Sequence, residues 1–458
     1  MKKYLDTNKI DYVLEHLKLR CDFPFGLSRR ILFLKQEELG EIPKNCLVFA
    51  LSKEEIRLDY QLDNLEIFYP IFPEATKHTI EKNGSIVFSH DIFKQIFCLQ
   101  TLYYEQEIKE RDKLGRIIPE ATLNHKVNIL KKPIVDYLYE IILDVFEEYC
   151  QKNNIPFQRI DILDNHTLLL SHDVDRTETY SFYNTLNSLK KLTLAPNQNN
   201  FTSVLKHLRE FSLGKKRSNP LWDFTKLRDI EQEFKLSSTY YFLNQGKLHQ
   251  DAYYSLSDPK ILKLIKEIEG DGNEIGIHLT IAGNLDKNIV ERNLRRLNRL
   301  VRQHVVGARS HWLRFEPTIT PDILAGLGIK YDTSIGHYSQ MGFRAGTCLP
   351  YKLFSFEKNE MLDLWEIPLV FMDCMVLDYQ KISEDEALRQ LEELLLEVVK
   401  FKGVFSLLWH NGNFANKKPY DRYEFYLKLL EMIMNSKPMN ISAKSLIASL
   451  EENLDVRN

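Results

Sequence analysis

The sequence predicts a mixed α/β protein whose larger part is an open or incomplete (β/α) barrel. After about residue 160, short apolar runs alternate with amphipathic helical patterns, which is typical of a parallel sheet covered by helices. Seven apolar runs are expected to form strands, at 167–171, 238–243, 274–278, 305–309, 329–332, 364–369 and 404–410. Helices are expected at 222–235, 257–268, 288–303, 384–401 and 421–434.

The pattern of apolar runs and helical stretches differs before residue 160. Two domains are therefore predicted: a smaller α/β domain over 1–160 and the barrel over 161–458. In the first part, strands are expected at 31–34, 46–51 and 67–72, and helices at 9–20, 91–104 and after Pro133. The polar, basic stretch 190–220 is expected to be an insertion of loops and a short helix at the periphery of the sheet.

Composition excludes several classes of protein. The 458 residues are 44% hydrophobic and 27% charged, which is ordinary for a folded globular chain. The net charge of −3 creates no overall positive potential that would attract nucleic acid. Six scattered cysteines without a C-x-x-C pair indicate reduced thiols. Neither a secretory signal nor a run of about 18 apolar residues is found. We therefore expect a cytoplasmic location and no membrane span.

Polar side chains gather where the predicted strands end. The groups at these ends are Asp173 and Asp175, His278, Arg309 with His311, Asp332, and His410. Because the carboxyl ends of parallel strands open on one face of a barrel, five strands would deliver His, Asp or Arg to one rim. The sequence therefore predicts a site on that rim.

These side chains can have a purely structural role as well as a catalytic or metal-binding one. Asp173 and Asp175 can share a pocket as general base and metal ligand, or one can cap a helix. His278 and His311 can be metal ligands or hydrogen-bonded structural residues. His410 suits a general acid, because imidazole titrates near working pH.

The ordered motifs resemble those of the polysaccharide deacetylase (NodB-homology) family. They are S-H-D-V-D at 171–175, E-I-G-I-H at 274–278, R-S-H-W at 309–312 and L-W-H at 408–410. The branch with an H-D-V-D first motif is most similar, through Y-D at 331–332 and G-F-R-A-G-T-C-L-P-Y at 342–351. The resemblance covers about 165–415. Residues 1–160 resemble the α/β accessory domain often fused ahead of that branch, including R-D-K-L-G-R at 111–116.

The resemblance implies a metal-dependent deacetylase of an amino sugar or glycan on a distorted (β/α)7 barrel. It assigns Asp173 as the base, Arg309 as the group that orients it, Asp175 and His278 as metal ligands, and His410 as the acid. The second histidine of the family's second motif is replaced here by Ala282.

A third metal ligand must therefore come from elsewhere, because a catalytic zinc ordinarily has three protein ligands. We expect His311 to supply it, with Asn284 or water as alternatives, and the expected cofactor is a divalent metal, zinc first. Four further residues are expected to contact substrate: Trp312, Asp332, Arg344 and Tyr351.

Other functions stay open at this point. Loss of a ligand also fits a metal-independent C–N (amide) hydrolase on the same fold, or a catalytically weak glycan-binding protein. A glycosidase is disfavoured, because Asp173 and Asp175 are too close in sequence to flank a glycosidic bond readily. The expected partner is a carbohydrate or small amide substrate and not nucleic acid; the sequence does not determine the natural substrate or the oligomeric state.

Overall fold

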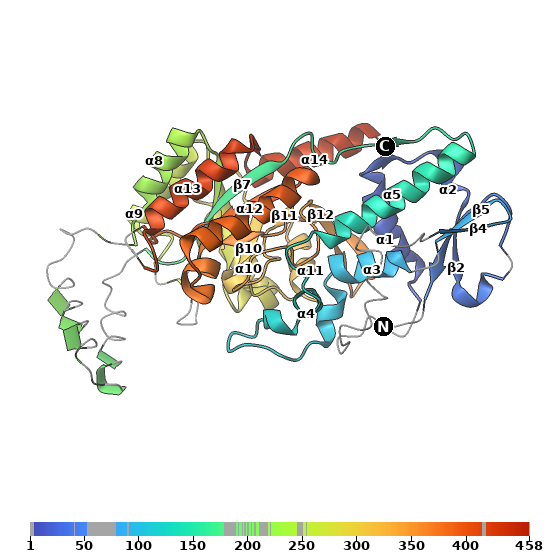
Figure 1. Ribbon diagram of the computed structural model, residues 1–458. Helices are drawn as coiled ribbons and strands as arrows, with labels where there is room; N and C mark the ends of the chain where they lie inside the picture. Colours follow the sequence, from blue (N-terminus) through green and yellow to red (C-terminus); the bar gives the residue numbers. More distant parts are fainter. Residues whose placement is uncertain are drawn as a thin grey trace.

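The structure is a computed structural model. It describes residues 4–40, 42–52, 79–88, 91–177, 219, 221–244, 251–252, 254–414 and 418–457, with scattered positions between 189 and 209. A small sheet lies at the right-hand end in Figure 1 and a large sheet lies to its left, under several helices.

The N-terminal region, defined here as residues 1–160, contains a four-stranded sheet in the order β2-β3-β5-β4. Its strands are β2 (Ile31–Lys35), β3 (Leu47–Leu51), β4 (Thr79–Lys82) and β5 (Ser85–Phe88). β2, β3 and β5 are parallel, and β4 is antiparallel to β5. The expected strand at 67–72 lies outside the described residues.

Three long helices pack beside this sheet: α1 (Thr7–Lys18), α3 (Ile92–Gln100) and α5 (Ile134–Lys152). Asp6 and Asp91 begin the first two, because their carboxylates accept hydrogen bonds from the N–H groups of Lys9 and Lys94. The shorter elements are β1 (Cys21–Asp22), α2 (Phe25–Ser28), α4 (Leu123–Lys126) and β6 (Gln158–Arg159), which pairs with β1. One apolar core joins these elements, drawn from residues 5–150 and Phe354.

The rest of the described chain is built on a ten-stranded sheet in the order β12-β13-β11-β10-β9-β8-β7-β15-β14, with β16 beside β7. The strands are β7 (Thr167–Val174), β8 (Ser238–Leu243), β9 (Glu274–Leu279), β10 (Gly307–Ser310), β11 (Tyr331–Asp332), β12 (Tyr351–Ser355), β13 (Glu360–Glu366), β14 (Phe371–Met372), β15 (Val404–Leu408) and β16 (Met439–Asn440). β7 is buried along its whole length between β8 and β15, which explains its continuous apolar run.

All seven expected strands are present within a few residues of their expected bounds, so the mixed α/β prediction is confirmed. The sheet is not wholly parallel, because β12 pairs with β13 as an antiparallel edge. Its edge strands β12 and β14 are not paired with each other in the described part of the chain, so this sheet is open.

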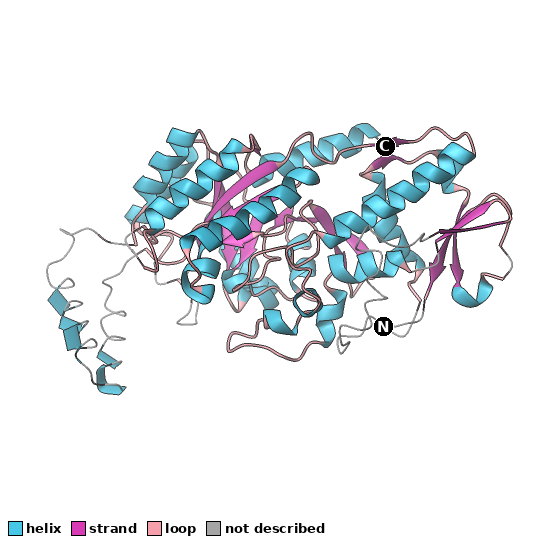
Figure 2. Ribbon diagram, viewed as in Figure 1, coloured by secondary structure: helices cyan, strands magenta, loops and turns pink. Residues whose placement is uncertain are grey.

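Helices cover the sheet (Figure 2). They are α8 (Phe224–Phe234), α9 (Pro259–Gly270), α10 (Lys287–Asn298), α11 (Thr320–Ala325), α12 (Glu384–Lys400), α13 (Arg422–Asn435) and α14 (Ala443–Arg457). Five of them match the expected helices. Among the described residues, no helix has the length and apolar character needed to cross a membrane.

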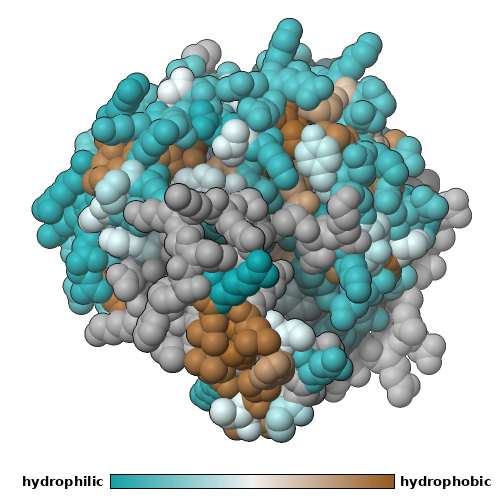
Figure 3. All heavy atoms as spheres, turned by 90° about the vertical axis from the view of Figure 1, so that its left-hand side faces the viewer, coloured by the Kyte–Doolittle hydropathy of each residue, from teal (hydrophilic) through white to brown (hydrophobic). Residues whose placement is uncertain are grey.

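Part of the polar stretch expected as an insertion is described, at the lower left of Figure 1. Its described positions between 189 and 209 are mostly helical and carry exposed apolar side chains, which form a brown patch in Figure 3: Leu194, Phe201, Leu205 and Leu208.

Candidate active site

A cavity of about 320 Å³ opens at the carboxyl ends of the central strands. Its lining includes Asp173 in β7 and Asp175 directly after that strand. It also includes His311 and Trp312 after β10, and His410 after β15. Parallel strands end together at this edge, and this is why residues more than 230 positions apart in the sequence face one space.

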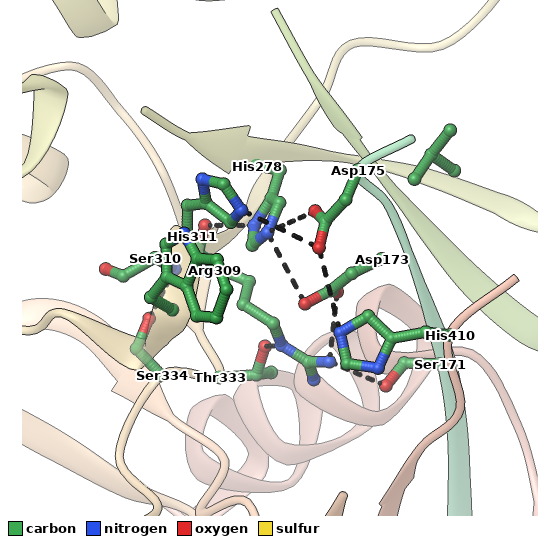
Figure 4. Close-up of polar contacts among 12 residues, drawn as sticks. Ser171, Asp173, Asp175, His278, Arg309, Ser310, His311, Thr333, Ser334 and His410 are labelled. Atoms are coloured by element: carbon green, nitrogen blue, oxygen red, sulfur yellow. Dashed lines mark hydrogen bonds and ion pairs between the residues drawn. The ribbon is translucent and has the colours of Figure 1, made fainter. Parts of the chain in front are cut away.

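Asp175, His278 and His311 form a cluster whose ligand-capable atoms all lie within 4.8 Å of one another. His278 Nε2 is 3.2 Å from Asp175 Oδ1, and His311 Nε2 is 3.6 Å from Asp175 Oδ2 (Figure 4). The two rings lie 5.1 Å apart, centroid to centroid. The structure thus brings together the three side chains that the sequence suggested as metal ligands.

The hydrogen bonds of His278 leave one nitrogen available. Its Nδ1 lies 2.9 Å from the carbonyl oxygen of Arg309 and donates to it, so Nε2 is the nitrogen left to face Asp175. Nε2 and Asp175 Oδ1 are both buried and neither makes a hydrogen bond. A buried ring nitrogen and a buried carboxylate oxygen that face each other at 3.2 Å without a hydrogen bond leave a place that a cation can occupy.

A carboxylate that the sequence analysis did not identify supports His311. Asp251 lies in the loop after β8 and is 2% exposed. Its Oδ1 is 3.3 Å from His311 Nδ1 and accepts a hydrogen bond from the N–H of Ile281. Burial alone would lower the pKa of His311, but Asp175 and Asp251 outweigh it and raise that pKa to about 9. A carboxylate behind a histidine is the usual support for a metal ligand.

Arg309 holds the carboxylate of Asp173 in place. The guanidinium Nη1 is 3.3 Å from Asp173 Oδ1 and donates to Ser171 Oγ at 2.9 Å, and Nε donates to Thr333 Oγ1 at 2.9 Å (Figure 4). Arg309 is completely buried and its guanidinium lies 4.6 Å from the ring centre of Tyr241. These contacts fix the direction in which the Asp173 carboxylate faces the cavity.

His410 is backed by a second unpredicted carboxylate, Asp373. His410 Nδ1 lies 2.7 Å from Asp373 Oδ1, and the backbone N–H of His410 donates to Oδ2 at 2.6 Å. Burial opposes protonation of the ring, but the charge of Asp373 and the hydrogen bond raise the pKa of His410 to about 10. The Nε2 atom faces Asp175 Oδ2 at 3.8 Å.

Of the four residues expected to bind substrate, only Trp312 lines the cavity. Arg344 is 5% exposed and its guanidinium forms a two-point ion pair with Glu105, at 3.1 and 2.6 Å. Tyr351 is 1% exposed and belongs to an apolar core. Neither side chain reaches the cavity that the expectation placed it in, because both are enclosed between the N-terminal region and the large sheet.

Asp332 is also enclosed beneath the site. Its two oxygens accept hydrogen bonds of 2.9 Å from the N–H and the hydroxyl of Ser334, and burial raises its pKa to about 6. It does not line the cavity in the structure, although the sequence suggested it as a substrate contact. Asn284, the alternative third ligand, is buried with its Oδ1 accepting the hydroxyl of Ser310 at 2.7 Å.

Comparison with known proteins gives one family and several distant structures. Residues 5–151 match a family of unknown function (DUF7033). A search of curated proteins found no match.

Similar solved structures include a protein from Mycobacterium smegmatis named as a polysaccharide deacetylase, at 16% identity, a TM-score of 0.42, and coverage of 63% of this chain and 91% of that chain. The PuuE allantoinase is 12% identical, with a TM-score of 0.40 and coverage of 62% and 89%. A CE4-family pseudoenzyme from Bacillus anthracis is 10% identical, with a TM-score of 0.30 and coverage of 62% and 66%. At such low similarity, the choice among activities rests on the site itself.

Proposed function

We propose that this protein is a metal-dependent hydrolase of the polysaccharide deacetylase type, which removes an acetyl group from an amino sugar or glycan. One observation carries the proposal: the buried Nε2 of His278 and Oδ1 of Asp175 face each other at 3.2 Å without a hydrogen bond, with His311 Nε2 beside them. The motif order of the sequence adds support.

The cluster suits a divalent metal with two nitrogen ligands and one oxygen ligand. His278, His311 and Asp175 would hold it, and three protein ligands are what a catalytic zinc ordinarily has. His311 would take over the task of the missing histidine at Ala282. The chemistry that a metal held by these residues would supply is polarisation of an acetyl carbonyl and a lower pKa of a bound water molecule.

The remaining side chains have separate tasks. Asp173, fixed by Arg309, accepts the proton of the attacking water. His410 donates a proton from Nε2 to the departing amine or alkoxide, because its Nδ1–H is held by Asp373. Trp312 offers an apolar wall for the sugar ring. Acid and base thus approach the scissile bond from different strands.

The cavity of about 320 Å³ is large enough for one sugar residue. We propose a neutral glycan or glycan precursor as substrate and a cytoplasmic site of action, as the composition and charge of the chain suggested.

Zinc titration tests the metal site directly. Metal-free wild-type protein should bind one zinc ion, and His278→Ala and His311→Ala should each weaken binding by at least about a hundredfold, measured by competition with a chromogenic chelator. His304→Ala, at an exposed histidine, is the matched control and should bind as wild type does. Equal affinity of wild type and His311→Ala would refute this ligand set.

Acetate release then tests the reaction. Wild-type protein loaded with zinc should release acetate from N-acetylated chitooligosaccharides, and removal of zinc should abolish the release. Hydrolysis that persists without metal would favour the alternative, a metal-independent amide hydrolase. Zinc binding without release from any acetylated sugar would favour a glycan-binding protein.

A further inference from the structure

A hairpin of the N-terminal region reaches the catalytic cavity. The chain turns at residues 111–117, where Arg111 and Ile117 form an antiparallel bridge and Gly115 adopts a φ of +78°. Arg116 ends this turn. Among the described residues that line the cavity, it is the one that comes from the N-terminal region.

Arg116 is held rigidly. Its Nε donates to Asp112 Oδ2 at 2.8 Å, and the Asp112 carboxylate also accepts the backbone N–H of Arg116 at 2.9 Å. The guanidinium lies 3.6 Å from the ring centre of Tyr338, and the side chain is 8% exposed. Its orientation is therefore determined before any ligand arrives.

Nη2 also pairs with Asp112, at 2.7 Å from Oδ2, and Nη1 is left to bind the backbone of the catalytic site. It donates to the carbonyl oxygen of Trp312 at 3.2 Å. Trp312 and Leu313 have φ values of +62° and +53°, so two successive residues with a Cβ occupy the left-handed region directly after His311. This conformation is unfavourable for such residues and persists only where neighbouring groups hold it.

The hairpin holds the same turn at further points. Arg111 pairs with Glu316 at 3.8 Å, and Gly115 lies beside the guanidinium of Arg314, where an added Cβ would be in ordinary contact at 3.5 Å. Farther along, the N–H of Phe343 donates to the carbonyl of Leu130 at 2.8 Å. The N-terminal region is thus attached on both sides of the catalytic loops.

We propose that the N-terminal region, whose family has no assigned function, completes the catalytic site: Arg116 fixes the left-handed turn at Trp312–Leu313 and thereby the position of His311. Arg116 is a positioning residue and does not touch the metal. The part of this inference that concerns metal binding rests on the proposed function.

The test compares Arg116→Gln with Lys113→Gln, an exposed neighbour on the same hairpin. Hydrogen exchange of metal-free protein, followed on a peptide covering 310–316, should be faster in Arg116→Gln and unchanged in Lys113→Gln. The zinc dissociation constant of Arg116→Gln should rise about tenfold, as it does when residues behind metal ligands are lost. Asp112→Asn, which keeps the arginine, should change both in the same direction and by less, and serves if Arg116→Gln does not fold.

The outcomes separate the two proposals. Unchanged exchange over 310–316 in Arg116→Gln overturns the positioning role, whatever the metal does. Faster exchange with unchanged zinc affinity also overturns it, because the turn would then move without moving the ligand. A wild-type protein that binds no zinc refutes the proposed metal chemistry, while faster exchange in the variant would still support the positioning role.

Discussion

Acidification is expected to weaken the attachment of α1 to the large sheet, through the buried ring of His16. Its Nδ1 lies 2.7 Å from the carbonyl oxygen of Tyr12, and its Nε2 accepts a hydrogen bond of 3.0 Å from the N–H of Lys352 in β12. Only the neutral ring can make both bonds. Burial, together with the charges of Arg20 and Lys352, lowers the pKa of His16 from 6.5 to about 4, although the bond to Tyr12 opposes this.

The sign and size of the effect follow from these pKa values. The unfolded chain takes up the proton near pH 6.5 and the folded chain only near pH 4, so the unfolded state binds more protons between them. The stabilisation is complete above pH 6.5 and is lost progressively as the pH falls toward 4. The loss in unfolding free energy is about 2 kcal/mol between pH 7.5 and pH 5, and about 3 kcal/mol once the pH is well below 4.

Urea unfolding followed by circular dichroism at pH 7.5 and pH 5 measures this loss. His16→Gln removes the titrating group, so wild type should lose about 2 kcal/mol more than this variant on acidification. His304→Gln, at an exposed histidine, is the control and should behave as wild type does. Parallel pH profiles of wild type and His16→Gln, within about 0.5 kcal/mol, would refute the reasoning.

Three further predictions concern the ion pairs around the site. Glu105→Ala leaves Arg344 buried without its charged partner and should lower the unfolding free energy by about 3–5 kcal/mol; a loss below about 1 kcal/mol would contradict this. Asp251→Asn should weaken zinc binding by about 10–100-fold in chelator competition, because the support of His311 is lost, and unchanged affinity would count against that role. Asp173→Asn should reduce acetate release by at least about a hundredfold while zinc still binds, and retained activity would exclude this residue as the base.

Much of the fold was predictable because the central strands are buried on both faces. Buried parallel strands such as β7 and β15 require continuous apolar runs, and these stand out between amphipathic helices. The strands that were missed in the large sheet are either an antiparallel edge, β12, or two residues long, β14 and β16, which is too short for any pattern.

The candidate site was predictable where its polar side chains lie at the carboxyl ends of strands that the sequence indicated. Asp373 was missed because it follows β14, although the run F-M-D at 371–373 has the same form as the other strand ends. Asp251 comes eight positions after the end of β8, and no local pattern connects it to His311.

The placement of Arg344 and Tyr351 away from the cavity was missed for a related reason. Arg344 was expected to contact substrate, but the structure uses the G-F-R-A-G-T-C stretch that contains it to join the N-terminal region. Gly342 has a φ of +128°, and a Cβ there would lie 2.3 Å from the carbonyl oxygen of Leu130. Gly346 accepts a hydrogen bond of 2.7 Å from the N–H of Val135. Glycine is needed where two backbones approach this closely.

The sequence by itself determined the order of strands and helices and the set of polar groups at the strand ends, because burial and strand direction leave a local pattern in the chain. The tertiary structure alone decided which carboxylate supports which histidine, that the N-terminal hairpin holds the turn after His311, and that Arg344 pairs with Glu105. These hydrogen bonds and ion pairs join residues that are 37 to 239 positions apart in the sequence. Which partners meet depends on tertiary packing, and no local sequence pattern indicates it.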